Sequence, residues 1–222
     1  MAVSNQLKNQ HLLWRGAFGP MAENVNELSE VSQKDLYNLL LKTSQKKPDE
    51  FNVARNLMDG LVKGVQDIGM MQKLSQDQKK TLRKQSVDDL KNLNLTWLNQ
   101  MINSEGQLRE KMSLFWHGHF ASRTVNILYQ QQLLDVIRNN ALGNFGDLLV
   151  AVSKSASMIN FLNNNKNRKG HPNENFAREV MELFTLGRGN YTESDIRESA
   201  RAFTGWGVSF DGQFVFRERQ HD

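Results

Sequence analysis

Apolar residues recur at intervals of three and four along almost the whole chain, which is the spacing of amphipathic helices. Polar residues that favour helix N-termini stand at Ser32, Ser75 and Thr192. The predicted helices cover residues 7–14, 33–47, 49–69, 76–103, 104–116, 128–142, 145–152, 155–162, 173–187 and 193–204. The pattern therefore predicts a mainly α fold, a multi-helix orthogonal bundle.

Near the C-terminal end the period of the pattern changes from helical to alternating. Two short apolar runs, 208–210 and 214–216, flank Asp211-Gly212, a dipeptide that favours a tight hairpin turn of type I′. We expect strand content only at about residues 207–217. With no repeat and no flexible linker, residues 1–222 are expected to form one domain.

The amino-acid composition excludes several classes of protein. The 222 residues are 39 % hydrophobic and 23 % charged, which is ordinary globular usage. The absence of cysteine excludes disulfide scaffolds, Cys-ligated metal centres and a Cys nucleophile. No apolar run approaches the roughly 18 residues of a membrane helix, and the first residues have no apolar core of a signal peptide. The sequence leaves the compartment open.

The charge does not favour nucleic acid as a partner. The net charge is only +4. The densest basic stretch contains Lys73, Lys79, Lys80, Arg83, Lys84 and Lys91. These residues alternate with Gln and Asp instead of aromatic residues, so we interpret the stretch as a solvated helix face.

The first cluster with chemical potential is Trp116-His117-Gly118-His119-Phe120, followed by Arg123. Imidazoles suit zinc, iron, copper or nickel. Residues two apart on a helix point about 200° apart, so both imidazoles reach one metal only if the helix ends near Gly118. The alternatives are a structural histidine at a helix end, a metal ligand, or a direct catalytic or binding role.

The second cluster lies within residues 170–187. Glu174, Arg178 and Glu182 are spaced four apart, so they form a ladder of opposite charges on one helix face. This ladder is either solvated or turned into a pocket. Glu179 and Glu182 could also share a metal with a histidine from elsewhere. Phosphate-binding loops, Gly-x-Ser-x-Gly elbows and His-Glu-x-x-His helices are absent from the sequence.

We expect the two clusters to meet. Both place histidine beside large apolar residues, where an imidazole without a hydrogen bond is costly. The predicted contact is a polar pocket between Trp116–Phe120 and the start of the 173–187 helix, with His119 paired to Glu179. Because the apolar arc of that helix is wide, Arg178 is expected to be buried.

These segments resemble a known bacterial family, the domain of unknown function numbered 1800. The matching motifs are Trp116-His117-Gly118-His119-Phe120, the stretch from Asn167 through His171-Pro172-Asn173-Glu174-Asn175 to Gly187, Tyr191 to Asp195, Ala200 to Trp206, and His11 to Arg15 with Phe18-Gly19-Pro20. The resemblance implies a mainly helical fold without an assigned reaction. Many members look exported, and many are encoded beside proteins resembling sulfatases and phosphatases. Members usually continue further, so we expect this chain to be an N-terminal portion.

Two hypotheses of function follow. In the first, the chain is a hydrolase or a metal-assisted enzyme with a His/Glu polar pocket; its metal and cofactor are not predictable. Its catalytic candidates are His117, His119, His171 and Glu179. Its binding candidates are Trp116, Arg123, Glu174, Asn175, Arg178 and Glu182. In the second, the chain is a non-catalytic binding or assembly module for a neighbouring sulfatase-like or phosphatase-like protein.

Overall fold

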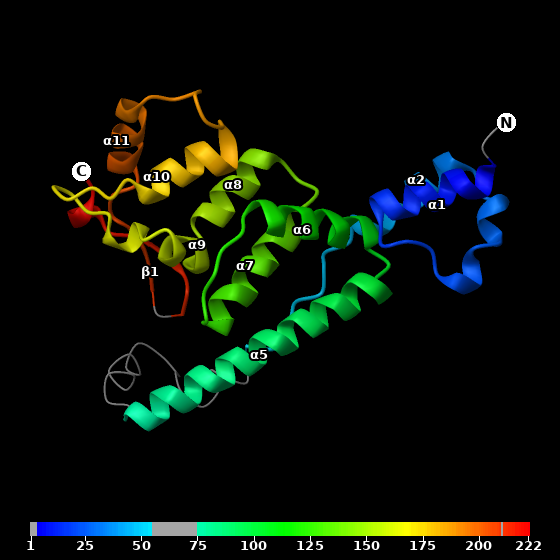
Figure 1. The fold of residues 1–222 in the computed structure, drawn as a ribbon, viewed down its shortest axis with the longest axis horizontal. Helices are drawn as coiled ribbons and strands as arrows, with labels where there is room; N and C mark the ends of the chain where they lie inside the picture. Colours follow the sequence, from blue (N-terminus) through cyan, green and yellow to red (C-terminus); the bar gives the residue numbers. More distant parts are fainter. Residues whose placement is uncertain (1–3, 55–74, 210) are drawn as a thin grey trace.

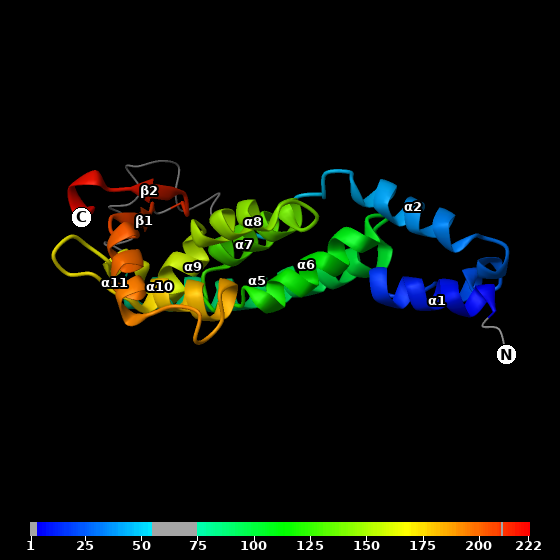
Figure 2. The same cartoon turned by 90° about the horizontal axis from the view of Figure 1, so that it is seen from above.

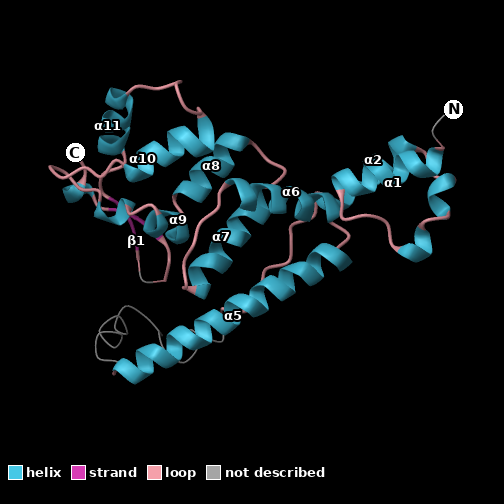
Figure 3. Ribbon diagram, in the orientation of Figure 1, coloured by secondary structure: helices cyan, strands magenta, loops and turns pink. Residues whose placement is uncertain are grey.

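The computed structural model describes residues 4–54, 75–209 and 211–222 (Figure 1). Most of these residues are helical, and a two-stranded hairpin lies near the C-terminal end (Figure 3), which confirms the predicted fold class. In chain order the helices are α1 (Asn5–Gly16), α2 (Gln33–Ser44), α5 (Gln76–Asn103), α6 (Gln107–His119), α7 (Ile127–Asn140), α8 (Phe145–Ser153), α9 (Ala156–Phe161), α10 (Asn175–Glu179) and α11 (Glu193–Ala202). The strands are β1 (Trp206–Val208) and β2 (Phe214–Phe216).

Side-chain caps fix where several helices begin. Ser32 Oγ accepts the Asp35 N–H at 3.1 Å at the start of α2, as its position in the sequence predicts. Thr192 and Asp195 form a reciprocal capping box at the start of α11. Each cap satisfies an N–H group that has no partner within the helix.

Most of the predicted helix 49–69 lies outside the residues that the structure describes. Its residues 55–69 lie outside the described ranges, and residues 49–54 form irregular and turn structure instead of a helix. The predicted helix 173–187 is divided: α10 is followed at once by a π-helix, Val180–Thr185, with wider turns.

The described elements form an elongated arrangement (Figure 2). α1 and α2 lie at one end, α5 to α9 occupy the middle, and α11 with the hairpin lies at the other end. α7 lies at the centre, because it packs against α5, α6, α8 and α9.

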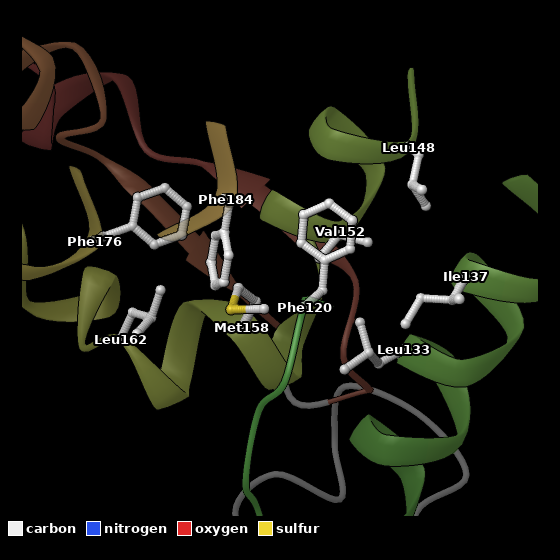
Figure 4. Close-up of a cluster of buried hydrophobic side chains, with 9 residues drawn as sticks. All are labelled: Phe120, Leu133, Ile137, Leu148, Val152, Met158, Leu162, Phe176 and Phe184. Carbon is white, nitrogen blue, oxygen red and sulfur yellow. The ribbon is translucent and has the colours of Figure 1, made fainter. Parts of the chain in front are cut away.

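Two clusters of apolar side chains make most of the core. The larger contains Phe120, Leu133, Ile137, Leu148, Val152, Met158, Leu162, Phe176 and Phe184 (Figure 4). The second contains Phe51, Ala54, Leu93, Trp97, Met101, Ile127 and Leu134, and it joins α5 to α7. The larger cluster brings the end of α6 against the π-helix, so it positions the two candidate motifs next to each other.

The hairpin begins earlier than the sequence predicts. Trp206 pairs with Phe216 and Val208 with Phe214 in antiparallel register. The connecting loop is held by Ser209, whose N–H donates to the Gln213 carbonyl at 2.8 Å. Because Ser209 lies opposite Gln213, the connection is longer than the predicted two-residue Asp211-Gly212 turn of type I′; Gly212, with φ +81°, supplies its left-handed backbone conformation.

Candidate functional site

The two histidines of the first motif lie in the last turn of α6 and face different neighbours. The ring of His117 packs edge-on against Trp97 of α5, with ring centroids 5.2 Å apart. The Nε2 atom of His119 lies 3.1 Å from the carbonyl oxygen of Phe184. Because α6 remains helical through His119, the two imidazoles do not converge on one ligand.

His119 closes the end of the π-helix. It is half-buried, and its ring lies edge-on to those of Trp116 and Phe120, with centroids 5.7 and 4.7 Å away. Carbonyls in the last turn of a helix have no partner within it. A proton on His119 Nε2 donates to one of these carbonyls, that of Phe184. The imidazole therefore supplies a hydrogen bond that holds α6 against the π-helix.

Trp116 has a similar structural contact on another side of α6. Its Nε1–H donates to the carbonyl of Ala141, just after α7, at 3.1 Å. Its ring stacks on Phe120 with centroids 5.9 Å apart. An indole is a donor only, so this bond satisfies its one polar atom.

The expected meeting of the two motifs occurs, but at a different place. The polar contact of the Trp116–Phe120 segment is with the π-helix near its end, at Phe184, while Phe120 shares the larger apolar cluster with Phe176 of α10. Within the described residues, no hydrogen bond or ion pair joins His119 to Glu179. The imidazole proton is satisfied by the main chain instead of a carboxylate.

His117 borders a cavity of about 220 Å³ between α5 and the segment after α6. The cavity is also lined by Leu90, Leu93, Asn94, Trp97, Ser122, Thr124, Gln130 and Leu134. Burial lowers the pKa of His117 below its ordinary 6.5. The imidazole is therefore neutral at pH 7, and it lies beside both apolar and hydroxyl-bearing side chains.

Arg178 lies at the surface and not in the core, which corrects the expectation that it is buried. Its side chain is 35 % exposed. Its two terminal nitrogens donate to both carboxylate oxygens of Glu193 at 2.9 and 2.8 Å, and one also lies 3.2 Å from Glu174. Hydrogen bonds to Glu193, above all, raise the pKa of Arg178. The side chain links the start of α10 to the start of α11.

Glu182 belongs to a second polar group on the π-helix. Its carboxylate forms an ion pair with Arg188 and accepts the Tyr191 hydroxyl at 2.9 Å. These hydrogen bonds, the one from Arg188 first, lower the pKa of Glu182. Arg178 therefore pairs with Glu174 and Glu193, while Glu182 pairs with the loop before α11, so the predicted three-member ladder is divided.

The remaining predicted site residues lie apart from these groups. Asn175 donates from Nδ2 to the carbonyl of Leu162 at 3.0 Å. His171 is exposed, and its main chain forms a β-bridge with Arg168. Arg123 is exposed on the segment between α6 and α7. The described structure does not bring these three side chains together with His117 or His119.

Sequence reasoning missed a buried ion pair between α6 and α7. Arg138 and Glu110 have side chains only 1 % and 2 % exposed, and Arg138 Nη2 lies 2.7 Å from Glu110 Oε1. The Trp97 Nε1–H also donates to Glu110, at 2.9 Å. The Arg138 guanidinium stacks on Phe51, 4.1 Å from the ring centroid. One feature of the sequence could have indicated this pair. Arg138 follows Ile127 and Leu134 at helical spacing, so a charged residue lies on an apolar stripe of the helix.

Among the residues that the structure describes, no three His, Cys, Asp or Glu side chains are placed to hold a metal ion. In the same residues, none of the helices has the length and apolar character to cross a membrane.

The fold and the two motifs define a mainly helical protein in which motif side chains tie helix ends and loops together. The chain belongs to the family described as protein of unknown function (DUF1800), whose family model matches residues 11–222. This match confirms the resemblance that the motifs indicate. Neither a curated protein nor a solved structure matches the chain.

Proposed function

We propose that this chain is a binding and assembly module for another protein. The observation that supports the proposal is that the motif side chains form hydrogen bonds and ion pairs with other parts of the same chain. Trp116, His119 and Asn175 each bond a main-chain carbonyl, and Arg178 bridges two carboxylates. Polar networks satisfied in this way specify one packing of the core.

A surface for the partner is available on α5. Leu95, Leu98 and Ile102 are 64 %, 51 % and 56 % exposed. Their spacing of three and four places them on one face of the helix. Apolar side chains grouped at a surface are typical of protein–protein contacts. This face supports docking of a partner along the second half of α5, which follows the lower edge of the molecule in Figure 1.

The test is co-purification with a sulfatase-like or phosphatase-like protein of the kind encoded beside family members. We expect a stable complex by size-exclusion chromatography with light scattering. Leu98→Lys should weaken it by about tenfold or more, because a charge replaces a central apolar contact. Leu183→Lys, at an exposed site on the π-helix, is the matched control. No complex, or equal binding by both variants, contradicts the proposal.

The second candidate function is catalysis, and the observation that favours it is the cavity beside His117. A neutral imidazole near Ser122 and Thr124 has the character of a general base. Glycosides, phosphate esters and sulfate esters would be assayed as substrates. The metal content of the protein would be measured by elemental analysis. His117→Gln should reduce any turnover by about 100-fold, while His11→Gln, at an exposed residue of α1, should not. Turnover unchanged in His117→Gln rejects this candidate.

A further inference from the structure

The cavity beside His117 differs in its charge from other hollows of the described structure. α5, α6, the segment after α6 and α7 all contribute side chains to its lining. None of the nine lining residues is a lysine, an arginine, an aspartate or a glutamate. Three other hollows contain such residues, among them Arg217 in one and Asp135 in another. Because an ion that loses water without gaining a partner is costly, the uncharged lining favours a neutral ligand.

His117 is itself neutral and has unused hydrogen-bonding atoms. Burial lowers its pKa below the ordinary 6.5, and no charged group of the described residues contributes to that shift. A neutral imidazole has one N–H donor and one acceptor nitrogen. The ring is only half-buried, and neither nitrogen is fully buried or hydrogen-bonded to the rest of the described chain. Both remain available to a ligand in the cavity.

Two more lining side chains have unused polar groups. Asn94 of α5 is exposed, and its amide forms no hydrogen bond with another described residue. Thr124 Oγ1 accepts the Asn126 N–H at 3.2 Å, which leaves its own O–H to donate. Together with His117, these groups supply both donors and acceptors from three parts of the chain. A hydroxyl also donates and accepts, so a ligand with several hydroxyls matches this mixture.

The rest of the lining limits the size and shape of the ligand. Leu90, Leu93, Trp97 and Leu134 provide apolar surface, which suits C–H groups. The volume of about 220 Å³ is below the roughly 300–1,000 Å³ of pockets for drug-sized ligands. A single sugar ring is small and uncharged, with hydroxyls around its edge and C–H groups on its faces. It therefore meets all the requirements of this cavity.

The segment that carries Ser122 and Thr124 is held in place before any ligand binds. Ser122 Oγ lies 2.8 Å from Ser157 Oγ of α9. Ser86 Oγ of α5 donates to the Val125 carbonyl at 2.7 Å. These contacts fix the segment from two sides, which reduces the entropic cost of binding.

We propose that the cavity beside His117 binds a neutral monosaccharide. His117, Asn94 and Thr124 form hydrogen bonds with its hydroxyls, and the leucines contact its C–H groups. This inference rests on the cavity of the second candidate function and names its ligand class, but it does not require turnover.

The experiment is a saturation-transfer NMR titration of the 222-residue chain at pH 7. The probes are glucose, galactose and mannose, each beside its uronate, an anion, and its 2-amino form, largely a cation. We expect saturable binding of at least one neutral hexose, about tenfold tighter than binding of its two charged counterparts. No saturable binding by any of the three hexoses overturns the proposal, and so do charged counterparts that bind as tightly as their hexose.

Variants of the lining place the binding in this cavity. Asn94→Ala and His117→Phe should each weaken hexose binding by about fivefold, because each removes hydrogen bonds to hydroxyls. Circular dichroism checks that both variants keep the helical content of the wild-type chain. Asn92→Ala makes the same substitution at an exposed residue of α5 outside the lining and should change the affinity by less than about twofold. A loss in Asn92→Ala equal to that in Asn94→Ala overturns the proposal.

Binding and turnover are measured separately, so failure of this inference differs from failure of the catalytic candidate. Hexose binding without turnover of any glycoside or ester supports the inference and rejects only catalysis. Turnover of a phosphate or sulfate ester without hexose binding supports catalysis and overturns the inference.

Discussion

Two charged side chains are buried in the core of this protein. Glu110 and Arg138 form an ion pair between α6 and α7. Removing one partner of such a pair leaves the other charge uncompensated. Glu110→Gln should therefore lower the free energy of unfolding by about 3–5 kcal/mol, measured by urea denaturation. Glu105→Gln, in an exposed pair with Lys46, should cost under about 1 kcal/mol. Equal losses in the two variants would contradict this assignment.

A second prediction at this scale concerns Asp135, whose side chain is 24 % exposed. Burial raises its pKa to about 6 despite the nearby charge of Arg138. The folded protein thus binds a proton more tightly than the unfolded chain, and stability falls as pH rises from about 4 to about 6. Asp135→Asn should remove this slope and stabilise the protein at pH 7 by about 2–3 kcal/mol.

Urea unfolding at several pH values between 4 and 7 measures this effect. Asp88→Asn, at an exposed carboxylate of α5, is the matched control and should keep the slope of the wild-type protein. Parallel stability curves for Asp135→Asn and wild type would show that Asp135 titrates alike in the folded and unfolded states.

At the scale of elements, His119 joins α6 to the π-helix by one hydrogen bond to the main chain. His119→Phe keeps an aromatic ring but leaves the Phe184 carbonyl without its donor, so it should cost about 1–3 kcal/mol. His119→Gln can restore an N–H at a similar position and should cost less. Thermal unfolding of both variants tests this order. If Gln is the more damaging substitution, the ring contacts outweigh the hydrogen bond.

Arg178 links α10 to α11 across the surface, so its contribution should be modest and dependent on salt. Because the pair with Glu193 is exposed, we expect Arg178→Ala to cost about 1 kcal/mol or less, and less still at 1 M salt. Arg197→Ala, at an exposed arginine of α11, is the comparison. A loss of several kcal/mol measured by urea denaturation would instead indicate a buried network.

The same elements show what the sequence can and cannot predict. The start of α2 was predictable because Ser32 caps it locally, and the hairpin was predictable from Asp211-Gly212. The π-helix was not, because an apolar stripe at helical spacing does not distinguish α-helical turns from the wider turns of a π-helix. Neither was the partner of His119, since helical spacing predicts that the two histidines diverge but not which group each one meets.

Charged core residues escaped prediction for a related reason. A helix surface of Leu134, Ile137 and Arg138 predicts burial for the leucine and isoleucine, and ordinarily exposure for the arginine. Arg138 is buried because Glu110 and Phe51 contact it from two other segments, and Trp97 of a third segment donates to the same Glu110. Such a site is defined by tertiary contacts between α5, α6, α7 and the chain before residue 55.

At the scale of the whole molecule, α1 and α2 lie together at one end, where they pack against α6 (Figure 2). The buried residues of the three apolar clusters lie between Phe51 and Ala200, and Phe18, just after α1, packs against the second cluster from outside it. Arg109 of α6 is a main link. It donates to the Ser44 carbonyl at 2.9 Å and to the Arg138 carbonyl at 2.8 Å.

An end attached in this way should open without unfolding the core. We expect the amides of α1 and α2 to exchange hydrogen faster than those of α7, measured peptide by peptide with mass spectrometry. Arg109→Met keeps the apolar stem of the side chain but removes the donors that bridge Ser44 and Arg138. It should speed exchange in α2 by about tenfold while leaving α9 unchanged. Lys91→Met, which removes an exposed charge of α5 that pairs with Asp88, should leave α2 protected. If Arg109→Met instead speeds exchange uniformly, the two ends unfold as one cooperative unit, and Arg109 contributes to global stability.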